Sequence, residues 1–181
     1  MSLQHAILTA LLEKPSSGLD LTRRFDRSIG YFWTATHQQI YHELARLEDS
    51  GLIRAIPAER PAQGQRKEYE VLPAGRAELT AWVARSEDPR RSREPLLLRL
   101  RAAAVVGTGS GGGLAAELER HLELHRRQLA EYEEIEKRDF PEPRDAAAEP
   151  DRLRHLVLRA GIELENFWIT WLGRALTSLR Q

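Results

Sequence analysis

The strongest constraint on the fold is a change in hydrophobic spacing after the segment "THQQIYHELARLEDSGLI", residues 36–53. Thr36 and Gln39 have the spacing of a capping box, and a glycine near the end of the segment supplies a helix stop. Three aliphatic residues between them recur at helical spacing, namely Ile40, Leu44 and Leu47. The next apolar segments, "LIRAI" and "KEYEVL", are short, and the turn-forming "PAERPAQGQR" separates them. The pattern therefore predicts one amphipathic helix followed by a β-hairpin with a long, basic-tipped loop.

Two helices are predicted before that segment and one after the hairpin. The first helix has an apolar stripe formed by Leu3, Ile7, Leu8, Leu11 and Leu12. The second begins near Ser17, which has capping-box spacing with Asp20. Pro73 opens the helix after the hairpin. The positions expected to be buried in that helix are Leu79, Trp82 and Val83. Three helices, a hairpin and a further helix predict a winged helix-turn-helix domain over residues 1–88.

The rest of the chain predicts an all-helical second domain, which makes the whole chain mainly α. The charged, proline-bounded segment "SEDPRRSREP" is the expected join, and helical patterns then continue over residues 95–181. In the last predicted helix, from Asp151 to Leu179, apolar residues alternate steps of three and four, the spacing of a helix-packing seam. We expect this to be a dimerisation domain that pairs with a second chain. The dimerisation residues are predicted to be Leu153, Val157, Leu164, Phe167, Trp168, Trp171 and Leu172.

A winged helix-turn-helix places its third helix in the DNA major groove and its hairpin on the backbone. The face of the third helix opposite its aliphatic stripe carries few carboxylates and many hydrogen-bond donors. Base or phosphate contacts are expected there from His37, Gln38, Tyr41, His42 and Arg46. Phosphate contacts are expected from the wing and the second helix through Arg66, Lys67, Arg23 and Arg24. A second interpretation of Tyr41 stays open, in which its ring packs against the second helix.

Composition limits the other classes of function. The 181 residues include 27 basic and 27 acidic ones, so any electrostatic signature of DNA binding must be local. The chain has no cysteine, which excludes disulfides, thiolate catalysis and cysteine-ligated zinc. The N-terminal segment is typical of an amphipathic helix, so we expect a cytoplasmic protein without membrane contact. The sequence has no nucleophile elbow, metal triad or cofactor fingerprint, so we expect neither an enzyme nor a bound cofactor.

The segments "IYHELARLEDSGLI" and "QRKEYEVLPAGRAEL", with the tryptophan that follows them, resemble the PadR family of bacterial transcriptional regulators. The similarity runs in register over residues 3–85, and the helical remainder resembles the longer branch of that family. The family's helix tyrosine and its basic and tyrosine wing residues fall on Tyr41, Arg66, Lys67 and Tyr69. His42 departs from the family pattern, which often has proline there.

That resemblance implies a function and a set of partners. It implies a homodimer, held by C-terminal helices, that represses transcription from a palindromic operator in double-stranded DNA. It also implies release of the DNA in response to a small-molecule effector or a stress signal.

Other interpretations are left open by the sequence. One is a protein-interaction adaptor, in which the winged helix no longer binds DNA and the aromatic last helix docks a different protein; the balanced charge keeps this interpretation open. His121 and His125 stand one helical turn apart and could bind a metal that regulates the protein, although a solvated helix face is the simpler interpretation. Trp82, Trp168 and Trp171 could line a pocket for an aromatic effector instead of packing in a core.

Overall fold

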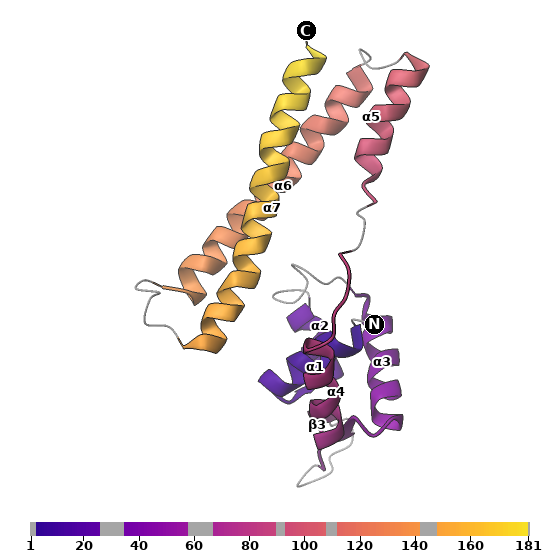
Figure 1. Ribbon diagram of the computed structural model, residues 1–181, viewed down its shortest axis with the longest axis vertical. Coiled ribbons are helices and arrows are strands. Elements are labelled where there is room, and N and C mark those ends of the chain that lie inside the picture. The colour runs from indigo at the N-terminus through magenta and orange to yellow at the C-terminus, as the bar shows by residue number, and fades with distance from the viewer. Residues whose placement is uncertain are drawn as a thin grey trace. The chain divides into compact units, whose positions relative to one another are not determined.

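The computed structural model describes residues 3–25, 35–57, 67–89, 93–107, 112–141 and 148–180. The chain divides into two compact units, residues 1–89 and 90–181. This division falls inside the charged segment "SEDPRRSREP". The first unit combines helices with a small antiparallel sheet, and every element that the structure describes in the second unit is a helix (Figure 1).

The elements of the first unit follow the order of a winged helix-turn-helix, with one unpredicted strand. They are helix α1 (Leu3–Glu13), strand β1 (Ser16–Ser17), helix α2 (Gly18–Arg24), helix α3 (His37–Asp49), strands β2 (Ile53–Ala55) and β3 (Glu68–Val71), and helix α4 (Pro73–Val83). The sheet order is β1-β3-β2, and Ser16 lies opposite Tyr69. Strand β1 consists of two serines and has no apolar alternation, so no sequence pattern indicated it.

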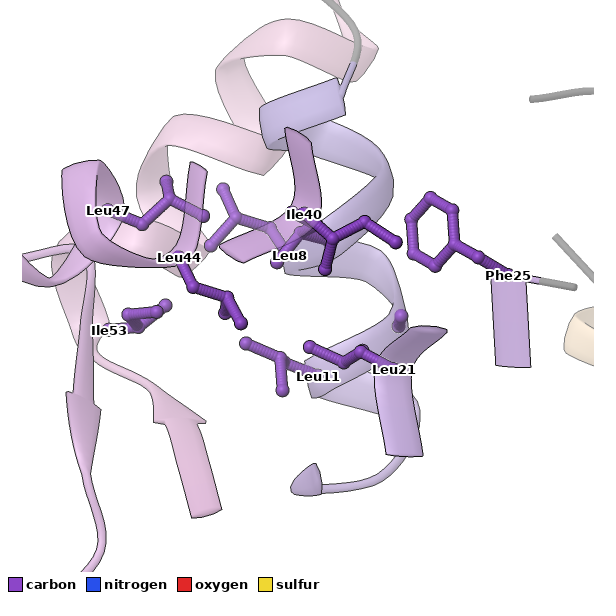
Figure 2. Close-up of a cluster of buried hydrophobic side chains, with 10 residues drawn as sticks. Leu8, Leu11, Leu21, Phe25, Ile40, Leu44, Leu47 and Ile53 are labelled. Carbon is purple, nitrogen blue, oxygen red and sulfur yellow. The ribbon is translucent and has the colours of Figure 1, made fainter. Parts of the chain in front are cut away.

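The core of the first unit lies between α1, α2 and α3 (Figure 2). Its labelled residues in that view are Leu8, Leu11, Leu21, Phe25, Ile40, Leu44, Leu47 and Ile53. The three aliphatic residues predicted to anchor α3 are at most 1% exposed. Burying an aliphatic side chain of this size contributes roughly 1.5–3 kcal/mol to stability, so these three contacts fix which face of α3 is turned outward.

Helix α4 packs on α1 through a buried histidine. The His5 ring stacks on Trp82 with a centroid separation of 4.4 Å, and its Nε2 lies 3.3 Å from Oε1 of Glu78. The expectation that Val83 is buried was wrong, because its side chain is 73% exposed. The face of α4 that carries Glu78 and Trp82 meets α1, and Val83 lies about a quarter-turn outside that face.

The second unit consists of helices α5 (Pro95–Val106), α6 (Gly112–Asp139) and α7 (Glu149–Leu179). Helices α6 and α7 pack side by side and run in opposite directions (Figure 1). The helices predicted in this unit are therefore confirmed, with ends that differ by at most two residues. A core cluster joins all three helices through Leu96, Leu118, Leu172 and Leu176.

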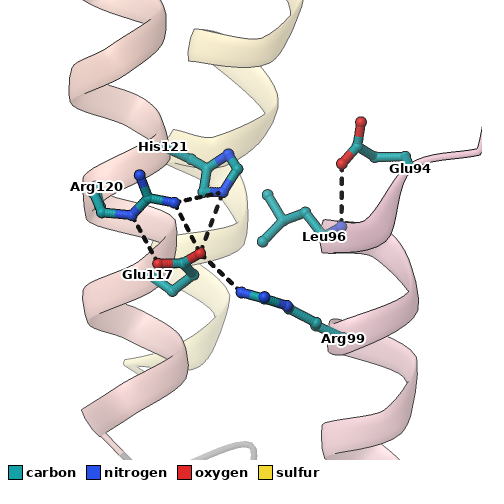
Figure 3. Close-up of polar contacts among 6 residues, drawn as sticks. All are labelled: Glu94, Leu96, Arg99, Glu117, Arg120 and His121. Atoms are coloured by element: carbon teal, nitrogen blue, oxygen red, sulfur yellow. Dashed lines mark hydrogen bonds and ion pairs between the residues drawn. The ribbon is translucent and has the colours of Figure 1, made fainter.

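A polar cluster also joins α5 to α6 (Figure 3). The carboxylate of Glu117 accepts hydrogen bonds from Arg99 of α5 at 2.8 Å and from Nε of Arg120 at 2.9 Å. His121 Nε2 lies 3.4 Å from the same carboxylate. The hydrogen bond from Arg120 is the main cause that lowers the pKa of Glu117 to about 2, and the positive charges of Arg120, His121 and Arg99 lower it further.

Candidate nucleic-acid interface

Helix α3 begins with the predicted capping box. Thr36 Oγ1 accepts a hydrogen bond from the backbone N–H of Gln39 at 3.2 Å, and Gln39 Oε1 accepts one from the backbone N–H of Thr36 at 2.8 Å. The two bonds satisfy N–H groups that a helix start otherwise leaves without partners. The box and the buried aliphatic anchor together orient the outer face of the helix. All five residues predicted on that face are exposed, namely His37, Gln38, Tyr41, His42 and Arg46.

Tyr41 packs against the second helix, as one of the two interpretations from the sequence expected, and also stays partly exposed. Its ring packs against the first residue of α2, and the residue is nevertheless 50% exposed. A methyl group at Gly18 would come within 2.5 Å of Cε1 of Tyr41. The ring can therefore lie in this position only because residue 18 has no side chain.

Arg46 is held by side chains from two helices. Its Nε and Nη2 donate to the carboxylate of Glu43, at 3.1 and 2.5 Å, and Nη2 also donates to Oε1 of Gln4 in α1 at 2.8 Å. The hydrogen bond to Glu43, and then its negative charge, raise the pKa of Arg46. Within the part of the chain that the structure describes, Nη1 of Arg46 has no partner, and the side chain is 55% exposed.

The base of the wing contacts the other flank of α3. Lys67 Nζ lies 3.5 Å from Oε2 of Glu48, while Arg66 lies outside the described residues. Tyr69 packs against the core. Burial is the main cause that raises the pKa of Tyr69, and the negative charge of Glu48 and the interaction with Tyr41 raise it further. Tyr69 of the wing strand therefore lies close enough to Glu48 and Tyr41 of α3 to interact with them electrostatically.

The two predicted arginines of α2 have different surroundings. Nη1 of Arg24 donates to the backbone carbonyl of Ala10 at 2.7 Å, and Nη2 donates to Glu13 at 2.7 Å, so Arg24 supports the C-terminal end of α1. No local sequence pattern indicated that contact. The Arg23 side chain is 60% exposed and lies 3.8 Å from Asp20. Arg23 is therefore more accessible to a phosphate than Arg24.

Comparison with known proteins identifies the family. Residues 7–81 match the transcriptional regulator PadR-like family, and residues 92–180 match the virulence activator alpha C-terminal domain. A probable transcriptional regulator of Mycobacterium tuberculosis is 41% identical over 190 residues, which cover 100% of this chain and 99% of that protein. The chain belongs to the PadR-like family of transcriptional regulators.

Several solved structures share the fold over nearly the whole chain. Bacillus subtilis PadR in complex with operator DNA has a TM-score of 0.83 and 26% identity, with 97% of each chain covered. The same protein in complex with p-coumaric acid has a TM-score of 0.78 and 25% identity, with 99% of each chain covered. The Vibrio cholerae virulence activator AphA has a TM-score of 0.80 and 31% identity, with 99% of this chain and 98% of that chain covered.

This PadR-like chain exposes an apolar stripe on α7. The stripe consists of Leu153, Leu156, Val157, Leu164 and Phe167, each between 45% and 63% exposed. Leu156 was missed by the sequence reasoning, which followed steps of three and four from Leu153. Leu172 is fully buried in the core of its own chain, so its side chain is not available to a second one. Trp168 and Trp171 pack at the edge of that core and are partly buried.

The histidine pair of α6 contacts two separate carboxylates. His121 approaches Glu117, whereas His125 Nδ1 lies 2.5 Å from Oε2 of Glu165 and its ring stacks on Trp168. Among the described residues, no group of three or more histidine, aspartate or glutamate side chains is arranged to hold a metal ion. The described helices include none that is long and apolar enough to cross a membrane.

Proposed function

We propose that this PadR-like regulator is a homodimeric repressor of a palindromic operator, with α3 of each subunit in the major groove and the wings on phosphates. The observation that carries the proposal is the outer face of α3, where hydrogen-bond donors stand opposite a fully buried aliphatic anchor. The similarity to PadR solved with operator DNA supports it. Repression is supported by a 28% identical relative, the negative transcriptional regulator PadR of Bacillus subtilis.

Some side chains of this interface would contact bases, and others would contact phosphates. Gln38 and Arg46 would read base edges, because amide and guanidinium groups pair with adenine and guanine in the major groove. His37, Tyr41 and His42 would contact bases or phosphates. Phosphate contacts would come from Lys67 and Arg66 of the wing, and from Arg23 and Arg24. These basic side chains would give the interface its positive charge in a chain without net charge.

Dimerisation would bury the apolar stripe of α7. Five large apolar side chains exposed along one face favour an interaction surface over a solvated one. Residues 95–181 would thus form the dimerisation domain and residues 1–88 the DNA-binding domain. Two paired DNA-binding domains match the twofold symmetry of a palindromic site.

We also propose a cytoplasmic protein with a binding role rather than a catalytic one, because its relatives are transcriptional regulators. A small-molecule effector would release the operator. This part of the proposal is supported by the structure of PadR with p-coumaric acid.

Footprinting with the full-length protein tests the proposal. The probes are DNA fragments upstream of the chain's own gene and of its neighbours. We expect two protected half-sites related by twofold symmetry, with centres one helical turn of roughly 10–10.5 base pairs apart or a multiple of it. A single protected segment without a symmetric mate would contradict the dimeric arrangement. Transcription in vitro from the protected promoter should fall when the protein is added, and a rise would contradict repression.

The adaptor is the second candidate, and the ion pairing of the described basic residues favours it. Lys67, Arg46, Arg24 and Arg23 each lie within 4 Å of a carboxylate of their own chain. Protection of no fragment, together with a monomeric mass in solution, would support the adaptor over the regulator.

A further inference from the structure

The basic side chains of the interface are not held equally firmly. Lys67 meets one carboxylate at 3.5 Å, and that carboxylate belongs to a side chain that is 32% exposed. Arg46 instead contacts Glu43, whose side chain is only 13% exposed, and it also contacts Gln4 from α1. Arg46 is therefore fixed from two helices, whereas Lys67 has one longer ion pair among the residues that the structure describes.

Glu43 and Gln4, which we call the clamp, contact one part of the Arg46 guanidinium and, within the described ranges, leave another part without a partner. A guanidinium has five N–H donors, of which Nε carries one and each Nη carries two. Glu43 and Gln4 engage Nε and Nη2, at distances between 2.5 and 3.2 Å. The two donors of Nη1 stay without a partner among the described residues, on a side chain that is 55% exposed.

Such a clamp would affect specific and non-specific DNA binding differently. An arginine that is already ordered loses less conformational entropy when it forms a base contact, which favours the matching sequence. The carboxylate of Glu43 partly neutralises the same guanidinium, which weakens its attraction to phosphates of any sequence. Both effects widen the difference between operator and random DNA.

We propose that Glu43 and Gln4 are positioning residues that set the DNA sequence preference, because they hold Arg46 with Nη1 free to donate to a base edge. The inference rests on the proposed function. A purely structural role for the clamp, as a link between α1 and α3, predicts a change in stability without a change in sequence preference.

Four variants separate these roles. Gln4→Ala removes one arm of the clamp without changing charge, and Glu43→Gln removes the carboxylate. Arg46→Lys keeps the positive charge, but a lysine ammonium lacks the planar N–H groups through which Glu43 and Gln4 hold the guanidinium. Glu134→Gln is the matched charge control, because Glu134 pairs with Lys137 at 2.8 Å on an exposed part of α6. The measurement is fluorescence anisotropy with the footprinted fragment and with random duplex, between roughly 50 and 200 mM salt. Thermal melting confirms that each variant is folded.

Gln4→Ala and Arg46→Lys should reduce the preference for the footprinted fragment roughly two- to tenfold, the effect expected from one side chain that is no longer ordered in advance. Their affinity for random duplex and their salt dependence should match those of the wild type. Glu43→Gln should reduce the preference similarly, raise the affinity for random duplex, and steepen the salt slope by up to about one unit. Glu134→Gln should change none of these quantities.

Wild-type preference in Gln4→Ala, Glu43→Gln and Arg46→Lys would overturn the inference and leave the proposed function standing, even if their melting temperatures fall. If Gln4→Ala does not fold, Glu43→Gln decides the question, since it removes a positioning group and leaves both α1 and Arg46 unchanged. A wild-type protein that binds every fragment and random duplex equally would overturn the proposed function, and the inference with it.

Discussion

Tyr41 and Gly18 show how one position can control an exposed side chain on α3. The methyl group of Gly18→Ala would come within 2.5 Å of the Tyr41 ring, so the half-exposed ring must shift from its position. We expect DNA affinity to fall roughly two- to tenfold, the worth of one misplaced hydrogen bond. Fluorescence anisotropy measures the affinity. Gly173→Ala is the control, because its methyl group would meet nothing within 4 Å beyond the adjoining residues and backbone of its own helix. Equal affinities of the two variants would show that the position of the ring does not matter.

Lys67 tests the wing at the same scale. Lys67→Ala should weaken binding to all sequences and make the slope of log affinity against log salt shallower by about one unit, because one phosphate contact is lost. Lys137→Ala makes the same charge change on an exposed position of α6 and should leave the slope unchanged. A slope in Lys67→Ala that equals that of the control would remove Lys67 from the DNA contact.

At the residue scale, the sequence predicted which side chains face outward but not which neighbours hold them. Helical spacing placed Tyr41 and Arg46 opposite the aliphatic anchor of α3, and both are exposed. Their partners Gly18 and Gln4 lie far away in the sequence, and no local pattern links such positions. The phosphate contact expected of Arg24 came from its place on the second helix alone, and that place does not reveal its hydrogen bonds to the end of α1.

At the scale of an element, the capping box of α3 makes a measurable contribution. Thr36→Ala removes the hydroxyl that accepts from Gln39 and should lower the free energy of unfolding by about 1 kcal/mol. Urea denaturation measures this difference. Ser178→Ala, at an exposed position in α7, should change the same quantity by less than about 0.5 kcal/mol. A Thr36→Ala protein as stable as Ser178→Ala would contradict the role assigned to the box.

The contact between α5 and α6 should depend on pH through Glu117. Its pKa is lowered from 4.5 to about 2, chiefly by the hydrogen bond from Arg120. A carboxylate with a lowered pKa stabilises the folded chain above the unfolded-state value of 4.5, and this stabilisation is lost as the pH falls from 4.5 through about 2. In urea denaturation, the stability difference between wild type and Glu117→Gln should therefore be constant near neutral pH and shrink across that window. A difference that does not change across the window would refute the ion-pair cluster.

Elements with strong periodicity were predictable, and elements without it were not. The long helices α6 and α7 followed from spacing alone, whereas β1 has two residues and exists only because β3 lies beside it. For α7 the apolar pattern predicted one packing seam, but apolar residues lie on two sides of the helix. One side packs inside the chain through Leu158, Ile162, Leu172 and Leu176, and the other carries the exposed stripe. A single helix sequence does not reveal which apolar side its own chain will cover.

At the scale of the whole molecule, the α7 stripe predicts the oligomeric state. Leu164→Asp places a charge in the middle of the stripe and should convert a dimer into a monomer, because an unpaired charge is costly to bury in an interface. Light scattering after size-exclusion chromatography measures the mass. Thr170→Asp adds the same charge on an exposed position outside the stripe and should stay dimeric. A dimeric Leu164→Asp protein would place the interface elsewhere.

The architecture was predictable because the order of elements has few alternatives. A helix with two ends defined by local signals, followed by a hairpin and a further helix, indicated the winged helix before any tertiary contact was known. The partner of the outer face of α3 does not follow from such local rules, since DNA and protein can both accept hydrogen bonds from Gln38 and Arg46.

The most direct test of a DNA-binding regulator is the fluorescence anisotropy of the full-length protein with labelled DNA at several salt concentrations. The fragments come from upstream of its own gene and of its neighbours, and random duplex is the control. We predict that one fragment is preferred over random duplex by about a thousandfold or more, with an affinity that falls steadily as salt rises. Equally weak binding to every fragment and to random duplex would contradict sequence-specific recognition by α3 and the wing.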